Sequence, residues 1–167
     1  MTESQQALEP RPPSFSRTEL AELMLPHNAN ILGKVFGGTI LSLIDKAAAT
    51  AAIRHAGRTC VTAQIDRITF REPIEIGEMV RFAAVVTYVG RTSLEVEVDV
   101  YALNVLNNTE RLTNTCLVTF VAVGDDGRPT PVPPLKLETD EERERHAKAK
   151  ERMIERKLRR AKARQQT

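Results

Sequence analysis

Apolar and polar residues follow two different periods along this chain. From about residue 38 to 56 nearly every position is apolar or small, and the only charges before the last turn are those of Asp45 and Lys46. A helix that is apolar on nearly all sides is a buried helix, and Gly57 is placed to end it. After residue 58 apolar residues recur at every second position, which predicts strands.

The alternating part predicts four strands joined by short turns, over residues 60–70, 79–89, 94–100 and 112–123. In the third, Leu and Val alternate with Glu and Asp, so one face is expected in the core and the other in water. Strands joined in this way form an antiparallel meander whose apolar face needs a cover, and the buried helix can supply it. We therefore expect an α+β fold: a single hotdog domain with an antiparallel sheet wrapped round one central helix. Its open edge favours pairing with a second copy.

The two ends of the chain differ in composition from this domain. Residues 1–16 are rich in Gln, Pro, Ser and Glu and are predicted to be a disordered tail. The hotdog domain is expected over 17–135, beginning with a helical turn or an edge strand at 18–25. Residues 136–167 are predicted to form a charged C-terminal helix, since the segment opens with a capping-box pattern at 139–142 and pairs opposite charges four positions apart. Either this helix is solvated, or its basic face attracts a phosphate-bearing ligand or a neighbouring subunit.

Composition argues against several classes of function. The 167 residues carry a net charge of +2 and no Trp, which indicates neither a nucleic-acid nor a membrane partner. Cys60 and Cys116 each lie in an apolar run and are expected to be reduced, structural thiols. The three scattered histidines offer no metal-ligand spacing. The N-terminus lacks the pattern of a secretory signal and no apolar run is long enough to span a bilayer, so we expect a cytoplasmic protein.

The candidate chemistry lies where a glycine-rich loop meets the buried helix. Backbone N–H groups near Gly37 and Gly38 have no partner within the helix, and there they can polarise a thioester or ester oxygen. Asp45 could act as a general base toward water or as a nucleophile, and Asn30 could orient water or a carbonyl. The sequence contains no nucleophile elbow, P-loop or dinucleotide fingerprint, which argues against triad hydrolases, nucleotide hydrolysis and dehydrogenases.

Each of these residues also has a purely structural interpretation. Asp45 could be a partnered structural carboxylate, Asn30 an ordinary turn residue, and the glycines the requirement of a tight loop. Asp66 is a competing acid, but its position on a predicted strand favours a solvated or ion-paired role. The spacing alone does not choose between these interpretations.

Several short motifs in a fixed order resemble those of the hotdog-fold acyl-CoA thioesterases. The resemblance is to the bacterial YciA-like group and to each half of the cytosolic brain-type two-hotdog acyl-CoA hydrolase, and it covers roughly residues 20–155. Its motifs are Asn28-Ala29-Asn30, Gly33, Val35-Phe36-Gly37-Gly38, Ile44-Asp45, His55-Ala56-Gly57, Val61-Thr62, Phe70-Arg71-Glu72-Pro73-Ile74, Gly77-Glu78, Val89-Gly90-Arg91-Thr92-Ser93 and Thr119-Phe120-Val121-Ala122-Val123.

The resemblance implies hydrolysis of fatty acyl-CoA to free fatty acid and CoA, with no metal or redox cofactor. It implies that Asp45 and Asn30 are catalytic and act together across a subunit interface, and that Gly37 and Gly38 polarise the thioester carbonyl. Gly90, Arg91, Thr92 and Ser93 match a connection that lies near the nucleotide and pyrophosphate of CoA.

The resemblance also bears on assembly and on rival functions. A chain with one hotdog needs a second copy to complete the site, so the resemblance implies a homodimer. Members of the group commonly assemble as trimers of such dimers, so a hexamer is expected. Phe36 stands where the brain-type halves have His, so no histidine is expected to be catalytic. The alternatives are a hotdog module that binds acyl-CoA without turnover, a hotdog dehydratase, and a basic tail that binds nucleic acid.

Overall fold

The structure of the chain is a computed structural model that describes residues 8–66 and 68–165, so residues 1–7 of the expected tail lie outside the described residues. The elements, in order, are α1 (Pro13–Ser16), β1 (Thr18–Leu23), the 3-10 helix η1 (Pro26–Asn28), α2 (Gly37–Ala56), β2 (Cys60–Ile65), β3 (Met79–Val89), β4 (Ser93–Asn104), β5 (Thr109–Ala122) and α3 (Asp140–Gln165).

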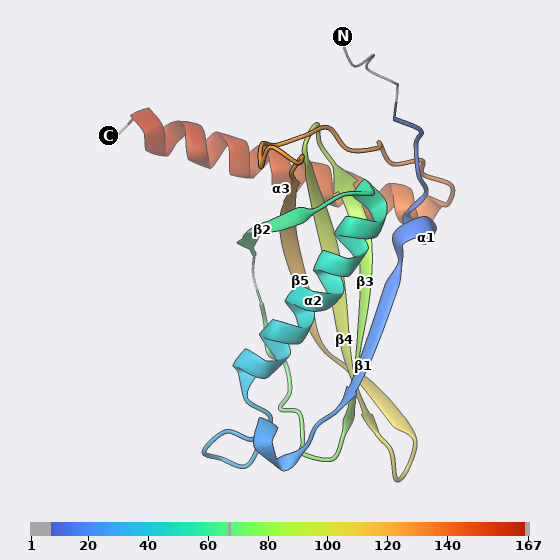
Figure 1. Cartoon of the computed structure of the whole chain (residues 1–167). Coiled ribbons are helices and arrows are strands. Elements are labelled where there is room, and N and C mark those ends of the chain that lie inside the picture. The colour runs from blue at the N-terminus through green and yellow to red at the C-terminus, as the bar shows by residue number, and fades with distance from the viewer. Residues whose placement is uncertain (1–7, 67, 166–167) are drawn as a thin grey trace.

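The strands form one five-stranded antiparallel sheet in the order β1-β3-β4-β5-β2. The sheet curls round α2, which crosses its inner face (Figure 1). This confirms the hotdog arrangement expected from the sequence. Of the two possibilities for residues 18–25, the edge strand is correct, because β1 pairs with β3 along its whole length.

The core lies between α2 and the inner face of the sheet. Ala47, Ala48, Ala51 and Ala52 are fully buried, and their small side chains let the helix lie close to the strands. Gly57 ends the helix as predicted: it has φ of 70° and its N–H bonds to the Ile53 carbonyl at 2.8 Å. Among the described residues, no helix is both long and apolar enough to cross a bilayer.

The first predicted strand is shorter than expected. β2 ends at Ile65 instead of residue 70, after a register shift between Thr62 and Gln64. The chain then runs as a loop that is tied to β5 by single contacts, including Asn114 Nδ2 to the Thr69 carbonyl at 3.1 Å. The strand-like residues continue to Phe70 in the sequence, but the chain after β2 leaves the sheet, and the Phe70 ring lies against Gly37 at the start of α2.

The outer face of β4, predicted to face water, is instead covered by α3. Glu95 is fully buried there and forms ion pairs with Arg152 and Arg156, each at 2.6 Å. Ala149 is also fully buried against the sheet. The predicted capping box is present, since Thr139 Oγ1 accepts the Glu142 N–H at 3.1 Å and Glu142 accepts the Thr139 N–H.

Part of the segment predicted as a disordered tail makes specific contacts. Arg11 donates its N–H to Pro134 and accepts the Lys136 N–H, both at 2.9 Å. Its guanidinium bonds to the His55 carbonyl at 2.6 Å, at the last turn of α2, where positive charge complements the helix dipole. Residues 11–16 therefore hold the C-terminal end of the central helix.

Candidate functional site

The start of α2 presents two unpaired backbone donors. Among the described contacts, the N–H groups of Gly37 and Gly38 have no hydrogen-bond partner, whereas Phe36 O accepts from Thr39 N at 3.0 Å. A Cβ on Gly38 would collide with the Phe36 ring, and one on Gly37 would lie 3.3 Å from Cζ of Phe70. The absence of a Cβ at both positions thus lets two phenyl rings pack close to the backbone at the start of the helix.

Asn30 is held so that its amide donor is left available. Its Oδ1 accepts the backbone N–H groups of Leu32 at 2.9 Å and Lys34 at 3.1 Å. These two bonds fix the orientation of the side chain. Within the part of the chain that the structure describes, Nδ2 has no partner, so this side chain can donate to a bound carbonyl or water.

Asp45 lies two turns inside α2, half-buried, and faces β2. Its Oδ1 accepts a hydrogen bond from Thr62 Oγ1 at 2.8 Å, and no described contact uses its other oxygen. Thr62 was not identified as a functional residue from the sequence, where it appears only within a matched motif. Threonine is common in strands, so nothing local distinguishes it; only the tertiary contact does.

The competing acid, Asp66, has a structural role. It is ion-paired with Arg156 at 2.9 Å and accepts a hydrogen bond from Gln64 at 2.6 Å. This agrees with the expectation of an ion-paired residue, and it leaves Asp45 as the candidate acid beside the inner helix.

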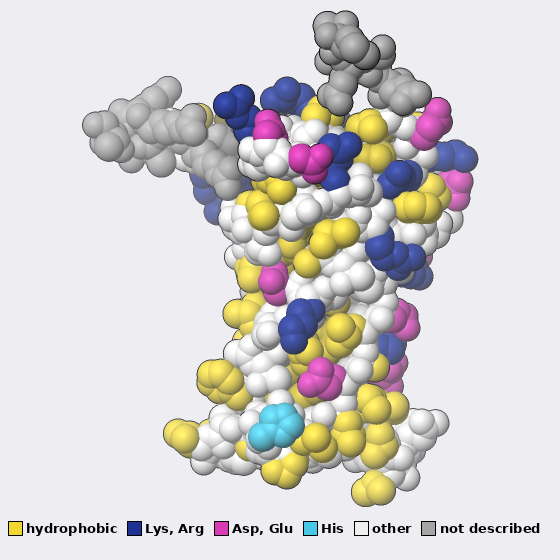
Figure 2. Space-filling view, viewed as in Figure 1, with side chains coloured by type: hydrophobic (Ala, Val, Ile, Leu, Met, Phe, Trp, Pro, Cys, Tyr) yellow, Lys and Arg dark blue, Asp and Glu magenta, His cyan; other side chains and the backbone are white. Residues whose placement is uncertain are grey.

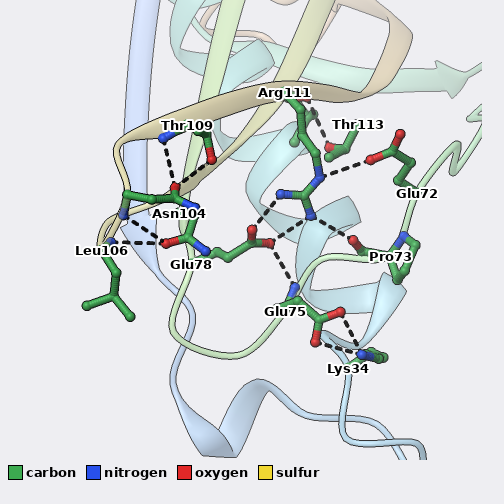
Figure 3. A network of polar contacts seen from close by, with 12 residues as sticks. Lys34, Glu72, Pro73, Glu75, Glu78, Asn104, Leu106, Thr109, Arg111 and Thr113 are labelled. Atoms are coloured by element: carbon green, nitrogen blue, oxygen red, sulfur yellow. Dashed lines mark hydrogen bonds and ion pairs between the residues drawn. The ribbon is translucent and has the colours of Figure 1, made fainter.

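Beside the helix start lies a cavity of about 370 Å³. It opens between the loop that carries Asn30 and the segment 70–74, and its lining includes Asn30, Leu32, Gly37, Ile40, Phe70 and Ile74. Ion pairs fix its rim: Lys34 bonds both oxygens of Glu75, at 2.6 and 2.7 Å, and Arg111 bonds Glu72 and Glu78 (Figure 3).

The structure brings only some of the predicted site residues together within one chain. Asn30 and Gly37 line the same cavity, but Asp45 is eight residues along the helix from Gly37, a rise of about 12 Å. The turn at 90–93 lies beyond the other end of α2, about 30 Å from its start, where Ala122 N bonds to Thr92 O at 2.9 Å (Figure 1). One chain therefore does not assemble the whole predicted site.

The turn at 90–93 is tight and carries a free cation. Gly90 N bonds to Ser93 O at 2.8 Å, and a Cβ on Gly90 would lie 2.9 Å from Ser93 Oγ. Arg91 is exposed, and its guanidinium makes none of the hydrogen bonds or ion pairs found in residues 8–66 and 68–165. Such a group can pair with a phosphate.

Other titratable groups of the core do not suit catalysis. Burial raises the pKa of both Cys60 and Cys116 to about 11, so the two thiols remain protonated and weakly nucleophilic. His55 is fully buried at the far end of α2, with Nε2 3.1 Å from the Pro133 carbonyl, and burial lowers its pKa.

One edge of the sheet is open next to Asp45. β2 is the last strand in the sheet, and Val61 on it is 47% exposed. Hydrophobic side chains also gather on the loop end of the molecule (Figure 2), where Ile31, Leu32 and Phe36 are exposed. An unpaired edge and apolar loop residues together indicate a surface for another chain.

Comparison with known proteins identifies the family. A model of the thioesterase superfamily matches residues 32–106. The acyl-CoA thioester hydrolase YkhA of Bacillus subtilis, itself uncharacterized, is 38% identical over 136 residues, which are 81% of this chain and 79% of YkhA. The cytosolic acyl coenzyme A thioester hydrolase of Rattus norvegicus is 32% identical over 154 residues, 91% of this chain but 40% of the rat protein.

Solved structures agree with this. An acyl-CoA hydrolase of Staphylococcus aureus, in complex with butyryl coenzyme A, coenzyme A and coenzyme A disulfide, has a TM-score of 0.85 and 35% identity, covering 93% of this chain and 94% of that one. Alanine variants of an aspartate, an asparagine and a threonine of that enzyme also match. A hexameric acyl-CoA thioesterase matches with a TM-score of 0.88 and 39% identity, covering 92% and 99%. The chain therefore belongs to the thioesterase superfamily, in the family of hotdog-fold acyl-CoA thioester hydrolases.

Proposed function

We propose that this chain hydrolyses acyl-CoA at a site shared between two copies of itself. That it is an acyl-CoA thioester hydrolase follows from its family; the shared site and the roles of its residues are the proposal. The observation that carries it is the separation of the parts: Asn30 and Gly37 lie at the start of α2, while Asp45 and Thr62 lie beside the open edge of the sheet.

A two-fold axis at this edge would bring the parts together. If two β2 strands pair antiparallel, the two α2 helices also run antiparallel, because each is fixed to its own sheet. The middle and C-terminal part of one helix then approaches the start of the other. In this dimer, Asp45 and the turn at 90–93 belong to one copy. They would face Asn30 and Gly37 of the other copy.

Assembly of the relatives supports this arrangement. The chain spans 40% of the rat enzyme, which leaves room there for a second domain, and the thioesterase with a TM-score of 0.88 is hexameric. We propose that this chain forms homodimers, and that three dimers associate into a hexamer.

The proposed reaction uses groups already in place. The thioester carbonyl accepts hydrogen bonds from the N–H groups of Gly37 and Gly38, where the helix dipole stabilises the developing oxyanion. The Asn30 amide orients the reacting group, and Thr62 fixes the carboxylate of Asp45. Asp45 either takes a proton from water as the water attacks, or attacks itself to form an anhydride that water then opens.

In both routes the C–S bond breaks, the hydroxyl of water is added to the acyl carbon and CoA leaves as its thiol. Arg91, with Gly90, Thr92 and Ser93, is proposed to bind the phosphates of CoA. These steps require no metal or redox cofactor. We place the protein in the cytoplasm, by analogy with the rat relative, which is named as cytosolic.

Release of CoA thiol from acyl-CoA tests the proposal. The wild-type chain is expected to release thiol, and Asp45→Ala to abolish release without changing the oligomer. Asp99→Ala is the control, since this acid bonds Thr115 on the outer face of the sheet. Binding of acyl-CoA without thiol release by the wild type would instead support the binding module, and Asp45→Ala with full activity would exclude the role of this acid.

A further inference from the structure

We propose that Lys34 and Glu75 are positioning residues for Asn30: their ion pair holds the loop 29–36 so that the free amide donor of Asn30 keeps its direction. The inference rests on the proposed function, in which Asn30 orients the reacting group, and it adds the residues that fix Asn30 in place. Lys34 and Glu75 act through Asn30 and not on a reacting atom. Nothing in the sequence pattern joins the two, since they lie 41 positions apart.

The tip of the loop 29–36 is ordered by polar contacts and not by packing. Ile31 is fully exposed and Leu32 is 78% exposed, so neither side chain anchors the tip on the core. Gly33 has φ of 73°, which lets the chain turn back, and its N–H bonds to the Asn30 carbonyl at 3.0 Å. A segment with few buried apolar contacts opens easily unless other contacts hold it.

Lys34 is the residue of this tip that joins Asn30 to the rest of the domain. Its backbone N–H donates to Asn30 Oδ1 at 3.1 Å, and its carbonyl accepts the Asn30 N–H at 2.7 Å. Its ammonium donates to both carboxylate oxygens of Glu75, at 2.6 and 2.7 Å, and the backbones of the two residues form a β-bridge (Figure 3). Lys34 therefore fixes the Asn30 side chain through its backbone while its own side chain is bound to Glu75.

Glu75 belongs to a segment that is itself fixed to the sheet. Its backbone N–H donates to Glu78 Oε2 at 2.9 Å, and Glu78 is 5% exposed. Arg111 of β5 donates to both oxygens of Glu78 and to the Pro73 carbonyl (Figure 3). The ion pair with Lys34 thus links the loop tip to β5 through side chains that are held in place, as a precise site requires.

The exposure of the ion pair separates a positioning role from a contribution to stability. The side chains of Lys34 and Glu75 are 42% and 47% exposed, and an ion pair in contact with water contributes little to the stability of a fold. A misplacement of about 1 Å in an active site can nevertheless cost about 100-fold in rate. We therefore expect loss of the pair to lower turnover while the fold keeps its stability.

Steady-state kinetics of acyl-CoA hydrolysis test the proposal in Lys34→Met, Glu75→Ala and the double variant. Each single change is expected to lower kcat by about tenfold or more, with KM and the melting temperature nearly unchanged, because the contacts that bind the substrate remain. The double variant should lose no more than either single one, since both changes break the same contact. Lys34→Arg keeps the pair and should remain close to the wild type.

Lys148→Met is the matched control, because it breaks an exposed pair of the same length, 2.6 Å to Glu144, on α3. This variant should keep the wild-type kcat. Wild-type kcat in Lys34→Met would overturn the proposal, and so would losses that multiply in the double variant. A rise in KM at constant kcat would also overturn it, because Lys34 would then bind the substrate directly.

A second measurement does not depend on turnover. Hydrogen exchange at short labelling times is followed in the intact protein, in peptides that cover the loop 29–36. Faster exchange in Lys34→Met and Glu75→Ala, but not in Lys148→Met, supports the proposal, and exchange as in the wild type overturns it. If the wild-type chain hydrolyses no acyl-CoA, the proposed function fails by itself, and the exchange still decides whether the pair holds the loop.

Discussion

At the scale of single residues, the bond between Thr62 and Asp45 is the contact that the sequence could not reveal. A carboxylate near the middle of a buried helix was noticed because charge is rare there. Its partner is an ordinary strand residue, 17 positions away, and only the fold brings the two within 2.8 Å. Asn30 and the two glycines were candidates from the glycine-rich loop and were supported by the family motifs, while their unpaired donors became visible only with the backbone geometry.

Removing the Thr62 hydroxyl should impair catalysis and spare binding. Thr62→Val keeps the shape but loses a hydrogen bond to a charged group, and such a bond contributes about 1.5–3 kcal/mol. We expect kcat to fall by about 10- to 100-fold with little change in KM. Thr115→Val is the matched control, because it removes a 2.8 Å bond to Asp99 outside the site. Equal effects of the two changes would contradict the assigned role.

His55 predicts a pH dependence of stability. Burial lowers its pKa in the folded state, so below the unfolded value of about 6.5 the unfolded chain binds the proton more readily. The free energy of unfolding should therefore decrease as the pH falls from about 7 to about 5, by up to about 1.4 kcal/mol per pH unit. Urea unfolding of His55→Gln should show a flatter dependence. His27→Gln, at an exposed histidine, is the control and should leave the pH dependence of unfolding unchanged. An equal flattening in both variants would show that His55 is not the cause of this dependence.

At the scale of elements, the sequence predicted the number and order of the long elements but not what covers the outer face. The alternation of Val with Glu along β4 is the same for a strand facing water and for one facing a charged helix. The arginines of α3 that meet Glu95 look like any solvated basic residues in the sequence. The end of β2 was also missed, because residues 68–70 have strand-forming side chains although their backbone lies outside the strand.

The docking of α3 can be measured through Arg156. This side chain is 10% exposed and pairs with the fully buried Glu95 and with Asp66. Arg156→Ala should lower the free energy of unfolding by about 2 kcal/mol, since it removes one of the two arginine partners of the buried Glu95 carboxylate. Arg159→Ala breaks an exposed pair with Glu155 and should cost less than about 1 kcal/mol. Chemical denaturation at one fixed protein concentration compares the free energies of unfolding of the two variants. An equal loss in both would show that the ion pairs of Arg156 do not hold α3 on the sheet.

At the scale of the whole molecule, the account depends on pairing at the β2 edge. Val61→Asp places a charge on that edge, and we expect it to reduce association and thiol release together. Val105→Asp changes a valine of similar exposure, 49% against 47%, on the turn between β4 and β5. That variant should assemble and react as the wild type does. Sedimentation measures the oligomeric state of both variants, and the thiol assay measures their activity. A Val61→Asp variant that is monomeric and fully active would refute the shared site.

The central claim is that Asn30 and Asp45 of one active site come from different copies of the chain. Asn30→Ala and Asp45→Ala are each expected to be nearly inactive. In a mixed dimer of the two, one of the two sites receives both native residues, so random reassociation should restore about a quarter of the wild-type turnover. Recovery of about a quarter in the random mixture, or of about half in isolated mixed dimers, is the predicted result. No recovery in such dimers would contradict the account.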